Sequence, residues 1–353
     1  MKVGLILPGN IWFCPYVKIY TKILDKNSCE YETISWNRDN TEPITETTFD
    51  LNIVSIKRVS KFTPFIKYLS FVKSTLRRKN YDKVIVFGPQ LGILLYPFLK
   101  KKYKNNFIFD YRDLSIEQLP MLKFVFKKLL AISSLNVISS LGFKKFLPKN
   151  NFIISHNFDA NLLAQETIDS SVDVFDQESI NVLTIGSIRD YDANLEVLKS
   201  LANKENIKLF FVGKGIVSDM LKEYAEDNKI YNVFFHGFYE KYEEANFIKS
   251  ATFINIYYPK IKSHSSAMSN RFYNALIYKR PMIVTNKSIQ GDYVEEYKLG
   301  LSLDNCNNLY EEIINYKKEF DFSTFDNSSN DLLTVFKNDY HVFYDRVKNF
   351  LEN

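Results

Sequence analysis

The sequence predicts an α/β protein built from two doubly wound, parallel-sheet domains in tandem. The chain has 353 residues, and at about 150 residues per domain this length favours two domains. Short apolar runs alternate with helical patterns along most of the chain, as repeated βα units do. A polar, acidic stretch, residues 164–179, interrupts this alternation, and we interpret it as the interdomain linker.

The first domain is predicted over residues 1–163. Its strands should be short runs rich in aliphatic and aromatic residues. They are expected at Lys2–Leu7, Leu51–Ile56, Lys83–Phe87, Phe107–Tyr111, Asn136–Ser139 and Asn151–Ser155. Two further segments, Pro64–Lys79 and Leu119–Ala131, have apolar residues at helical spacing, so helices are predicted there. Because the units alternate, the sheet should be parallel, with helices on both faces.

The alternation resumes at Ile180 and predicts a second domain over residues 180–330. Strands are expected within residues 180–186, 208–213, 232–237, 253–258 and 281–285. Helices are expected at residues 194–202, 218–227, 242–250, 270–278, 293–297 and 309–320. The closing segment, residues 331–353, has a long amphipathic pattern and predicts a C-terminal helix.

The composition argues against several classes of protein. Cys14, Cys29 and Cys306 are too few and too scattered for a disulfide framework or a CxxC zinc site, which fits a reducing cytosol. No two histidines have metal-binding i,i+4 spacing, so no metal site is predicted, and His264 is interpreted as a solvated loop residue. The longest candidate for a spanning helix, Gly88–Leu99, is shorter than the roughly 20 apolar residues required. We therefore predict a cytoplasmic protein with no spanning helix.

Positive charge is concentrated in the first domain. Up to Ala160 the chain has 25 Lys and Arg against 12 Asp and Glu, whereas the remainder has 21 against 29. The basic residues lie in runs with aromatic and aliphatic ones, at residues 61–79, 97–104, 123–130 and 143–146. This combination favours an anionic membrane surface as a partner, although ordinary solvated helices would have the same pattern. Nucleic acid is not expected, because no RNP, KH or zinc-finger signature occurs.

A ligand site is expected at the strand-to-helix turns, because ligands of such sheets bind beyond the carboxyl ends of the strands. Gly9 and Asn10 follow the first strand, where a glycine lets backbone N–H groups approach a phosphate or sugar. Neither GxGxxG nor GxxxxGK[ST] occurs, which argues against hydride transfer and ATP hydrolysis. Arg112 lies between Asp110 and Asp113, and its planar guanidinium suits a pyrophosphate. A self-contained Asp–Arg–Asp surface cluster is the alternative.

Three turns of the second domain each contain a cation. Arg189 follows the first strand of this domain, Lys214 follows the next, and Arg271 opens a helix together with Ser269 and Asn270. We predict that the three cations and the helix N-terminus converge on one anion. A nucleoside diphosphate needs such a cluster, above all as a leaving group whose negative charge grows in the transition state. Taken singly, each cation is better explained as an ordinary surface residue; it is their common position after successive strands that favours a shared site.

These turns are part of a longer resemblance. Within residues 181–301 the blocks NVLTIGSIR, LFFVGKG, NVFFHGF, SATFINIYY, SNRFYNALIYKRPMIVT and VEEYKLGLSL follow one another as in the donor half of retaining GT-B glycosyltransferases. The sequence resembles in particular the family 4-like enzymes of bacterial capsular and exopolysaccharide synthesis. The first half resembles the acceptor half more loosely, through LPGN, FIFDYRDLS, VISSLGF and IISHNFD. The resemblance implies two Rossmann-like domains facing a central cleft, a nucleotide-sugar bound between them, and a closing helix packed on the first domain.

The resemblance also implies the roles of individual residues. Arg189 and Arg271 would hold the diphosphate, Asn270 and Asn274 would lie beside the sugar and ribose, and Phe238 would line the base. Lys214 and Ser269 complete the donor site predicted from the turns.

In the first domain, Gly9 and Asn10 would face the donor sugar and its phosphates. Arg112 or Asp113 would occupy the strand end from which many relatives contact the donor sugar, and these two residues and Arg271 are the predicted catalytic groups. The paired glutamates of the family correspond to Ser266 and Asn274 here, so both carboxylates are absent.

We therefore expect a hexosyltransferase-like glycosyltransferase that needs no cofactor beyond its nucleotide-sugar donor and no metal, because cationic side chains hold the diphosphate. The resemblance implies retention of configuration, a polyprenyl-diphosphate-linked glycan acceptor, a role in surface polysaccharide synthesis and peripheral attachment to the inner face of the plasma membrane. Two alternatives stay open. One is a catalytically silent GT-B partner protein, which the missing glutamates motivate. The other is a nucleotide-sugar epimerase, which would need neither acceptor nor membrane.

Overall fold

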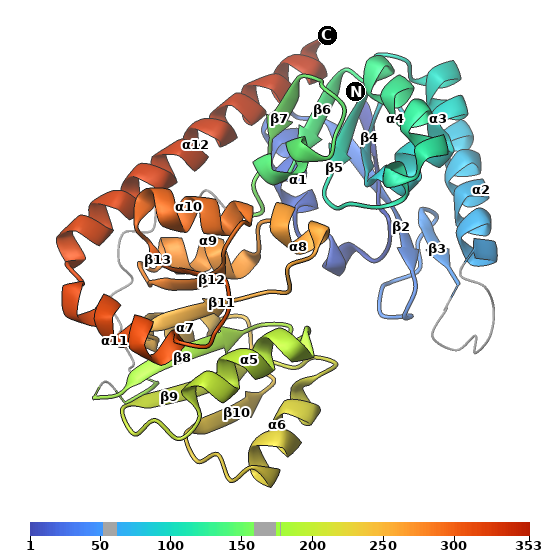
Figure 1. Ribbon diagram of the computed structural model, residues 1–353. Coiled ribbons are helices and arrows are strands. Elements are labelled where there is room, and N and C mark those ends of the chain that lie inside the picture. Colours follow the sequence, from blue (N-terminus) through green and yellow to red (C-terminus); the bar gives the residue numbers. More distant parts are fainter. Residues whose placement is uncertain (52–61, 159–173, 177) are drawn as a thin grey trace. The chain divides into compact units, whose positions relative to one another are not determined.

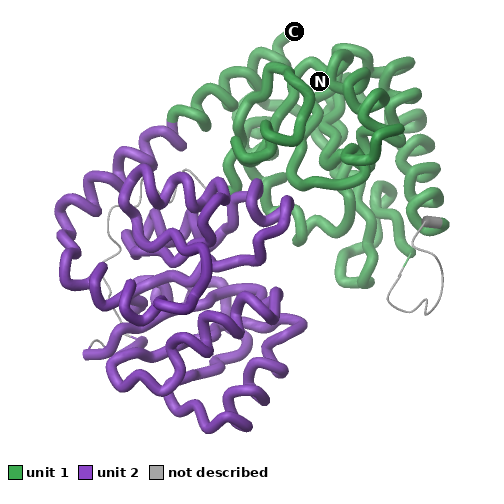
Figure 2. Tube along the Cα trace, viewed as in Figure 1, with its two compact units in different colours: residues 1–157, 338–353 green, residues 158–337 purple. Residues whose placement is uncertain are grey.

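The computed structural model describes residues 1–51, 62–158, 174–176 and 178–353. It divides into two compact units (Figure 2): unit 1 comprises Met1–Asn157 with Asn338–Asn353, and unit 2 comprises Phe158–Lys337. Most of the predicted linker, residues 164–179, lies outside the described residues, as does most of the predicted strand Leu51–Ile56.

Unit 1 is built on a seven-stranded, entirely parallel sheet (Figure 1) with the order β3-β2-β1-β4-β5-β6-β7. The strands are β1 (Lys2–Ile6), β2 (Glu30–Asn37), β3 (Thr48–Asp50), β4 (Lys83–Phe87), β5 (Phe107–Tyr111), β6 (Leu135–Ile138) and β7 (Phe152–Ile154). The strand order reverses between β1 and β4. Their carboxyl ends therefore flank the switch point at which ligands of doubly wound sheets bind.

The helices of unit 1 connect these strands. They are η1 (Ile11–Phe13), α1 (Val17–Lys26), α2 (Phe62–Lys79), α3 (Pro89–Lys102), η2 (Ile116–Gln118), α4 (Pro120–Ile132) and η3 (Leu141–Lys145). α3 packs between α2 and α4 on one side of the sheet (Figure 1). α2 and α4 agree with the predicted helices to within two residues at each end. α1, α3 and β2 were not predicted; β2 alternates polar and apolar residues, so it contains no continuous apolar run.

The end of the C-terminal helix α12 (Phe322–Glu352) completes the core of unit 1. Phe343 and Val347 are fully buried in the cluster that contains the side chains of β1 and α1. The ring of Phe343 meets that of Tyr20 edge to face at 5.1 Å. The helix begins at Phe322 rather than at the predicted residue 331, because its polar first turns give no hydrophobic signal.

Unit 2 contains a six-stranded parallel sheet with the order β10-β9-β8-β11-β12-β13. Its strands are β8 (Ile180–Ile185), β9 (Ile207–Val212), β10 (Val233–Gly237), β11 (Phe253–Ile256), β12 (Met282–Thr285) and β13 (Gly300–Leu303). The strand order reverses between β8 and β11, so this sheet has its own switch point there.

The helices of unit 2 alternate with its strands. They are α5 (Tyr191–Leu201), α6 (Ser218–Asp227), α7 (Glu244–Ser250), α8 (Lys262–Ser266), α9 (Asn270–Ile277), α10 (Ile289–Tyr297) and α11 (Leu309–Glu319). α6 has the predicted bounds, and α5, α9 and α11 lie within three residues of theirs. The short elements α8 and β13 were not predicted. Across the described parts of both units, no helix combines the length and the hydropathy needed to cross a membrane.

Candidate functional site

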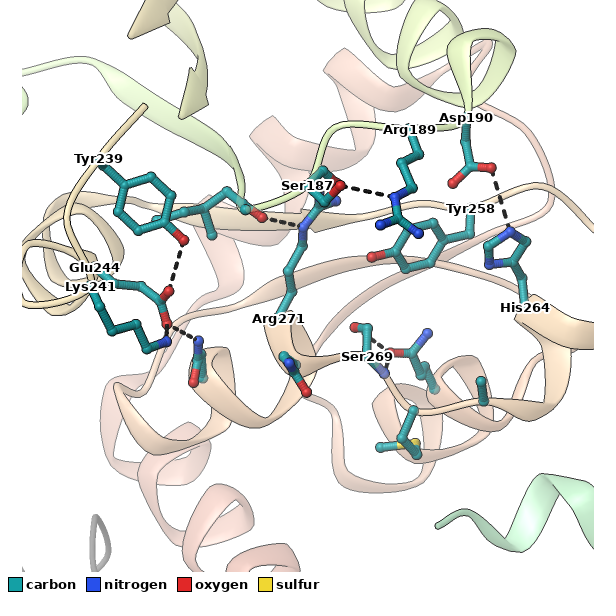
Figure 3. Close-up of a pocket in the computed structure, with 17 residues that line it drawn as sticks. Ser187, Arg189, Asp190, Tyr239, Lys241, Glu244, Tyr258, His264, Ser269 and Arg271 are labelled. Carbon is teal, nitrogen blue, oxygen red and sulfur yellow. Dashed lines mark hydrogen bonds and ion pairs between the residues drawn. The ribbon is translucent and has the colours of Figure 1, made fainter. Parts of the chain in front are cut away.

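A pocket of about 350 Å³ lies at the carboxyl edge of the unit 2 sheet (Figure 3). Its walls come mainly from four places: the turn from β8 to α5, the turn from β10 to α7, the segment after β11, and the start of α9; Gln290 of α10 completes the lining. β8 and β11 are the neighbours at which the strand order reverses. The pocket therefore occupies the position where doubly wound sheets bind their ligands.

Arg271, on the first turn of α9, is the central cation of this pocket. Its side chain is held by backbone carbonyls, because Nε donates to Ile185 O at 2.5 Å and NH2 donates to Ser187 O at 2.9 Å. A longer bond of 3.4 Å joins NH1 to Asn255 O. Arg271 is only 8% exposed, and no ion pair among the described residues includes it. No carboxylate among the described residues therefore neutralises its positive charge within the pocket.

Arg189 supplies a second guanidinium on the same side of Arg271 as Asp190 and His264 (Figure 3). Its Nε donates to Ser187 Oγ at 2.9 Å, and both side chains are exposed. Of the three predicted cations, the structure brings Arg189 and Arg271 together in one pocket. Two guanidinium groups there form a cluster suited to a diphosphate.

The start of α9 is fixed by Ser269, the N-cap residue. Its Oγ accepts from Phe272 N–H at 3.3 Å and donates to Gln290 Oε1 at 2.8 Å, while its own N–H donates to the same oxygen at 3.0 Å. Gln290 is buried, so this network anchors the helix N-terminus at the pocket. Asn270 follows on the surface and also lines the pocket. The N–H groups of this turn add partial positive charge.

A carboxylate, Glu244, lies on the other side of Arg271 (Figure 3). It accepts hydrogen bonds from Tyr239 OH at 2.8 Å, Lys241 Nζ at 2.6 Å and Asn274 Nδ2 at 2.7 Å. Burial, together with the charge of Glu244, raises the pKa of Tyr239 above its usual value. Asn274 stands where the resemblance implies a glutamate. The pocket nevertheless contains a carboxylate next to it, that of Glu244.

His264 and Asp190 form the far wall of the pocket. Asp190 Oδ1 lies 3.4 Å from His264 Nε2, and the imidazole stacks on the Tyr258 ring at 5.2 Å. His264 belongs to α8 and lines the pocket, so its interpretation as a solvated loop residue was wrong.

Lys214 and Phe238 do not line the pocket, although the sequence analysis assigned both to the donor site. Lys214 is exposed and lies between Gly213 and Gly215. At both positions the backbone of a neighbouring turn leaves no room for a side chain. A Cβ at Gly213 would lie 2.1 Å from Gly186 O, and one at Gly215 would lie 1.6 Å from a backbone carbonyl. These glycines let the turns after β8 and β9 pass one another.

Ser266, which corresponds to one of the two family glutamates, does not line the pocket. It is 1% exposed, and its hydroxyl donates to Lys262 O at 2.6 Å within α8.

In unit 1, Asn10 is fully buried in the turn after β1. Its Nδ2 donates to Asp39 at 2.5 Å and to Asn37 at 3.3 Å, while its Oδ1 accepts from Arg38 N–H at 3.1 Å. The side chain therefore holds this turn against the end of β2. Gly9 is also buried there, and its carbonyl accepts from the main chain of β2.

Arg112 forms a buried ion pair with Asp110 at the end of β5. Its Nε lies 2.6 Å from Asp110 Oδ1, and NH1 donates to Ser155 O at 2.9 Å. Burial alone would lower the pKa of Arg112, but the paired carboxylate and two tyrosines raise it. The cluster is thus internal rather than a surface cluster, and Asp113 is its exposed neighbour.

Several pocket residues were not identified from the sequence, among them the polar residues Asp190, Tyr239, Glu244 and Gln290. The rule that ligands bind after strands identifies the turn from β10 to α7, and it would have included Tyr239 and Glu244 had it been applied past Phe238. No local signal identifies Gln290, because it comes from α10.

No family model matches the sequence, and no curated protein matches it either. The structure, however, is similar to several solved structures. A sucrose-phosphate synthase from Thermosynechococcus elongatus aligns with a TM-score of 0.73 and 12% identity, covering 100% of this chain and 99% of that one. HepE from Anabaena, solved in complex with UDP, aligns at 0.67 and 13%, covering 100% of both. A putative UDP-N-acetylglucosamine 2-epimerase from Listeria monocytogenes aligns at 0.57 and 12%, covering 93% of this chain and 90% of that one.

These likenesses establish the fold. The protein has the GT-B fold of glycosyltransferases, with two Rossmann-like parallel-sheet units, as predicted. The narrower resemblance, to family 4-like enzymes of capsule and exopolysaccharide synthesis, stays a prediction.

Proposed function

We propose that the protein is a glycosyltransferase that transfers one sugar from a nucleoside-diphosphate donor to a glycan acceptor. The observation that carries this proposal is the pocket at the unit 2 switch point, which contains two guanidinium groups and a capped helix N-terminus in a GT-B fold. Retention of configuration and a hexose as the transferred group rest on the sequence resemblance.

In this proposal the side chains of unit 2 bind and stabilise the departing diphosphate. The bond between the anomeric carbon and the diphosphate oxygen breaks, a bond from that carbon to the acceptor oxygen forms, and the proton of the acceptor hydroxyl passes to the departing diphosphate. Negative charge then accumulates on the diphosphate, where Arg271 is already oriented by three carbonyl groups. A preorganised cation lowers the barrier because it needs no reorientation as the charge develops. Since Arg189 and Arg271 neutralise the diphosphate, no metal is required.

The nucleotide base is proposed to be uracil. The support comes from HepE, which has been solved in complex with UDP and with UDP-glucose.

The acceptor is proposed to be a polyprenyl-diphosphate-linked glycan at the inner face of the plasma membrane, as in surface polysaccharide synthesis. The helices α2, α3 and α4 support this attachment, because none of them contains an Asp or Glu. Most apolar residues of the basic runs, such as Tyr68 and Phe143, are buried core residues. The start of α4 differs, because Leu119, Met121 and Phe124 are 56%, 88% and 63% exposed. These three residues, beside the lysines of α4, form the proposed membrane anchor.

A thermal-shift panel of UDP, GDP, CDP, dTDP and their sugars tests the donor site. A ligand at 100 times its dissociation constant stabilises the folded state by about 2.7 kcal/mol, which raises the melting temperature by several degrees. We expect a shift with UDP and its sugars alone. No shift with any of them would contradict the donor site.

A second candidate function is a nucleotide-sugar epimerase, which the likeness to the Listeria structure favours. Incubation with UDP-N-acetylglucosamine in the absence of any acceptor separates the two. An epimerase would convert the sugar, whereas the proposed transferase leaves its configuration unchanged.

A third candidate, a catalytically silent partner, is motivated by Ser266 and Asn274 in place of the family glutamates. Binding of UDP-sugar without any turnover in the presence of acceptor would favour it.

A further inference from the structure

Unit 1 exposes three consecutive large apolar side chains in the turn after β1. Ile11, Trp12 and Phe13 form the 3-10 helix η1 and are 44%, 59% and 54% exposed. The Trp12 and Phe13 rings stack on each other with centroids 3.7 Å apart and planes inclined by 26°. Single exposed apolar residues are common on folded proteins, but a contiguous aromatic group marks a binding surface.

This aromatic pair is held in place by the residues around it. The N–H of Ile11 donates to Glu42 Oε1, and Cys14 N–H closes the turn on Ile11 O at 2.8 Å. The preceding residue, Asn10, is fully buried and bonded to Asp39. The rings therefore stand on a fixed backbone, so a ligand that stacks on them loses little affinity to ordering the protein.

The pair also lies at the end of the sheet where a ligand of unit 1 should bind. η1 directly follows β1, one of the two strands at the switch point. The Arg112 guanidinium lies over the Tyr16 ring at 4.6 Å, which links the start of α1 to the end of β5. The aromatic pair thus belongs to the same sheet edge as the predicted catalytic residue Asp113.

The charges beside the pair favour a neutral ligand with hydroxyl groups over an anionic one. Asp39 accepts a hydrogen bond from the Asn10 side chain, and Glu42 accepts one from the Ile11 N–H. Arg38 is the one cation in the sequence of residues 38–42. The local charge is therefore negative, unlike the acid-free helices α2, α3 and α4. An anionic lipid surface would be repelled here, whereas carboxylates accept hydrogen bonds from sugar hydroxyls.

A pyranose ring matches both properties of this surface. One face of the ring presents C–H groups, whose partial positive charge is attracted to the negative face of an indole or phenyl ring. Its rim presents hydroxyl groups, which donate to carboxylates. A prenyl chain would use the aromatic faces but not the carboxylates.

We propose that Trp12 and Phe13 form the platform on which a pyranose ring of the acceptor glycan stacks, with Asp39 and Glu42 accepting hydrogen bonds from its hydroxyl groups. This inference rests on the proposed glycosyltransferase function and assigns the acceptor sugar to a place in unit 1.

The experiment uses the two tryptophans of the protein, because Trp12 is exposed and Trp36 is 1% exposed. Acrylamide quenching of the fluorescence then reports on Trp12, and a sugar stacked on it protects the indole. The probes are maltose, cellobiose, chitobiose and lactose, each up to 100 mM, with the acyclic polyol mannitol as the control ligand. We expect protection by at least one disaccharide and none by mannitol. No protection by any disaccharide, or equal protection by mannitol, overturns the proposal.

Two variants test the same site by ligand-observed saturation-transfer NMR, which does not depend on a tryptophan reporter. Trp12→Ala should weaken disaccharide binding about tenfold or more, whereas Trp12→Phe should keep most of it. The matched control is Phe322→Ala, because Phe322 is also 59% exposed but lies at the start of α12. Unchanged binding in Trp12→Ala overturns the proposal, as does an equal loss in the Phe322 variant.

Further measurements separate other occupants and the failure of the proposed function. If Trp12→Ala lowers binding to anionic vesicles or dissociates a dimer while saccharide binding is unchanged, the platform serves a membrane or a second copy, and the proposal is wrong. UDP binding is measured in parallel and should be the same in Trp12→Ala and the original protein. Saccharide protection without any UDP binding would refute the transferase function, whereas UDP binding without saccharide protection would refute the platform alone.

Discussion

Replacing Arg271 should cost both stability and nucleotide affinity, whereas replacing Arg189 should cost affinity alone. Arg271→Ala leaves three backbone carbonyls without their charged donor, two of which accept bonds of 2.5 and 2.9 Å. A hydrogen bond to a charged group contributes about 1.5–3 kcal/mol. The two short bonds together therefore contribute about 3–6 kcal/mol, and water that enters the pocket would recover part of this. We expect a net loss of about 2–4 kcal/mol in the free energy of unfolding.

The matched change is Arg189→Ala. Arg189 is exposed, and among the described residues its side chain donates a hydrogen bond to exposed Ser187, so its loss should change stability by less than about 0.5 kcal/mol. Thermal unfolding of both variants without ligand should lower the melting temperature by about 5–15 °C for Arg271→Ala and by about 2 °C or less for Arg189→Ala. Titration with UDP should show at least tenfold weaker binding for each.

Two results would refute this reasoning. A melting temperature of Arg271→Ala within 2 °C of the original protein would show that the three carbonyl bonds contribute little. Unchanged UDP affinity in both variants would show that the guanidinium pair does not hold the diphosphate. Arg271→Lys keeps the charge but loses the planar fork. Its melting temperature and its UDP affinity should therefore lie between those of Arg271→Ala and the original protein.

Three further predictions concern other parts of the molecule. Transfer activity should persist in EDTA, measured as UDP release, because the two arginines neutralise the diphosphate; full loss restored by Mg²⁺ would contradict this. Partial burial would raise the pKa of Glu32, but hydrogen bonds from Tyr81 and two lysines lower this pKa to about 2. The stabilisation from Glu32 should thus be complete above the unfolded pKa of about 4.5 and disappear as the pH falls towards 2. Urea unfolding of Glu32→Gln should show a deficit above pH 5 that vanishes in acid, and a constant deficit would contradict the assignment. Binding to anionic liposomes should fall with added salt and with Met121→Asp or Phe124→Asp, measured by cosedimentation; salt-insensitive binding would indicate insertion or a protein partner instead.

Much of the fold could be predicted because buried parallel strands leave a strong hydrophobic signal. β4 and β5 have the predicted bounds, since both are continuous apolar runs buried on both faces. β2 was missed because polar residues are spread along it, among them Ser35 and Asn37 in its buried half, so it contains no continuous apolar run. The start of α12 was missed because its first turns are polar; its amphipathic face becomes clear only further along.

The candidate site could be located from the sequence but not assembled in detail. The strand-end rule found Arg189 and the start of α9, because both depend on chain connectivity alone. It could not show that Arg271 is held by three carbonyls, or that Glu244 lies against Asn274, because these contacts join elements far apart in the sequence. It also assigned Asn10 to a ligand, whereas burial and three hydrogen bonds use its amide to fix the turn. Sequence position thus predicted which turns to examine, and packing decided which side chains remain available.

The order in which the two units can fold during synthesis follows from the division of the chain. During synthesis, Met1–Asn157 of unit 1 leave the ribosome well before Asn338–Asn353, which belong to the same unit. Unit 2 ends at Lys337, so all of its residues emerge before unit 1 is complete. Until Phe343 and Val347 have emerged, the core that receives them remains open to solvent and exposed to chaperones and proteases. A chain terminated before Asn338 would therefore lose part of the core of unit 1.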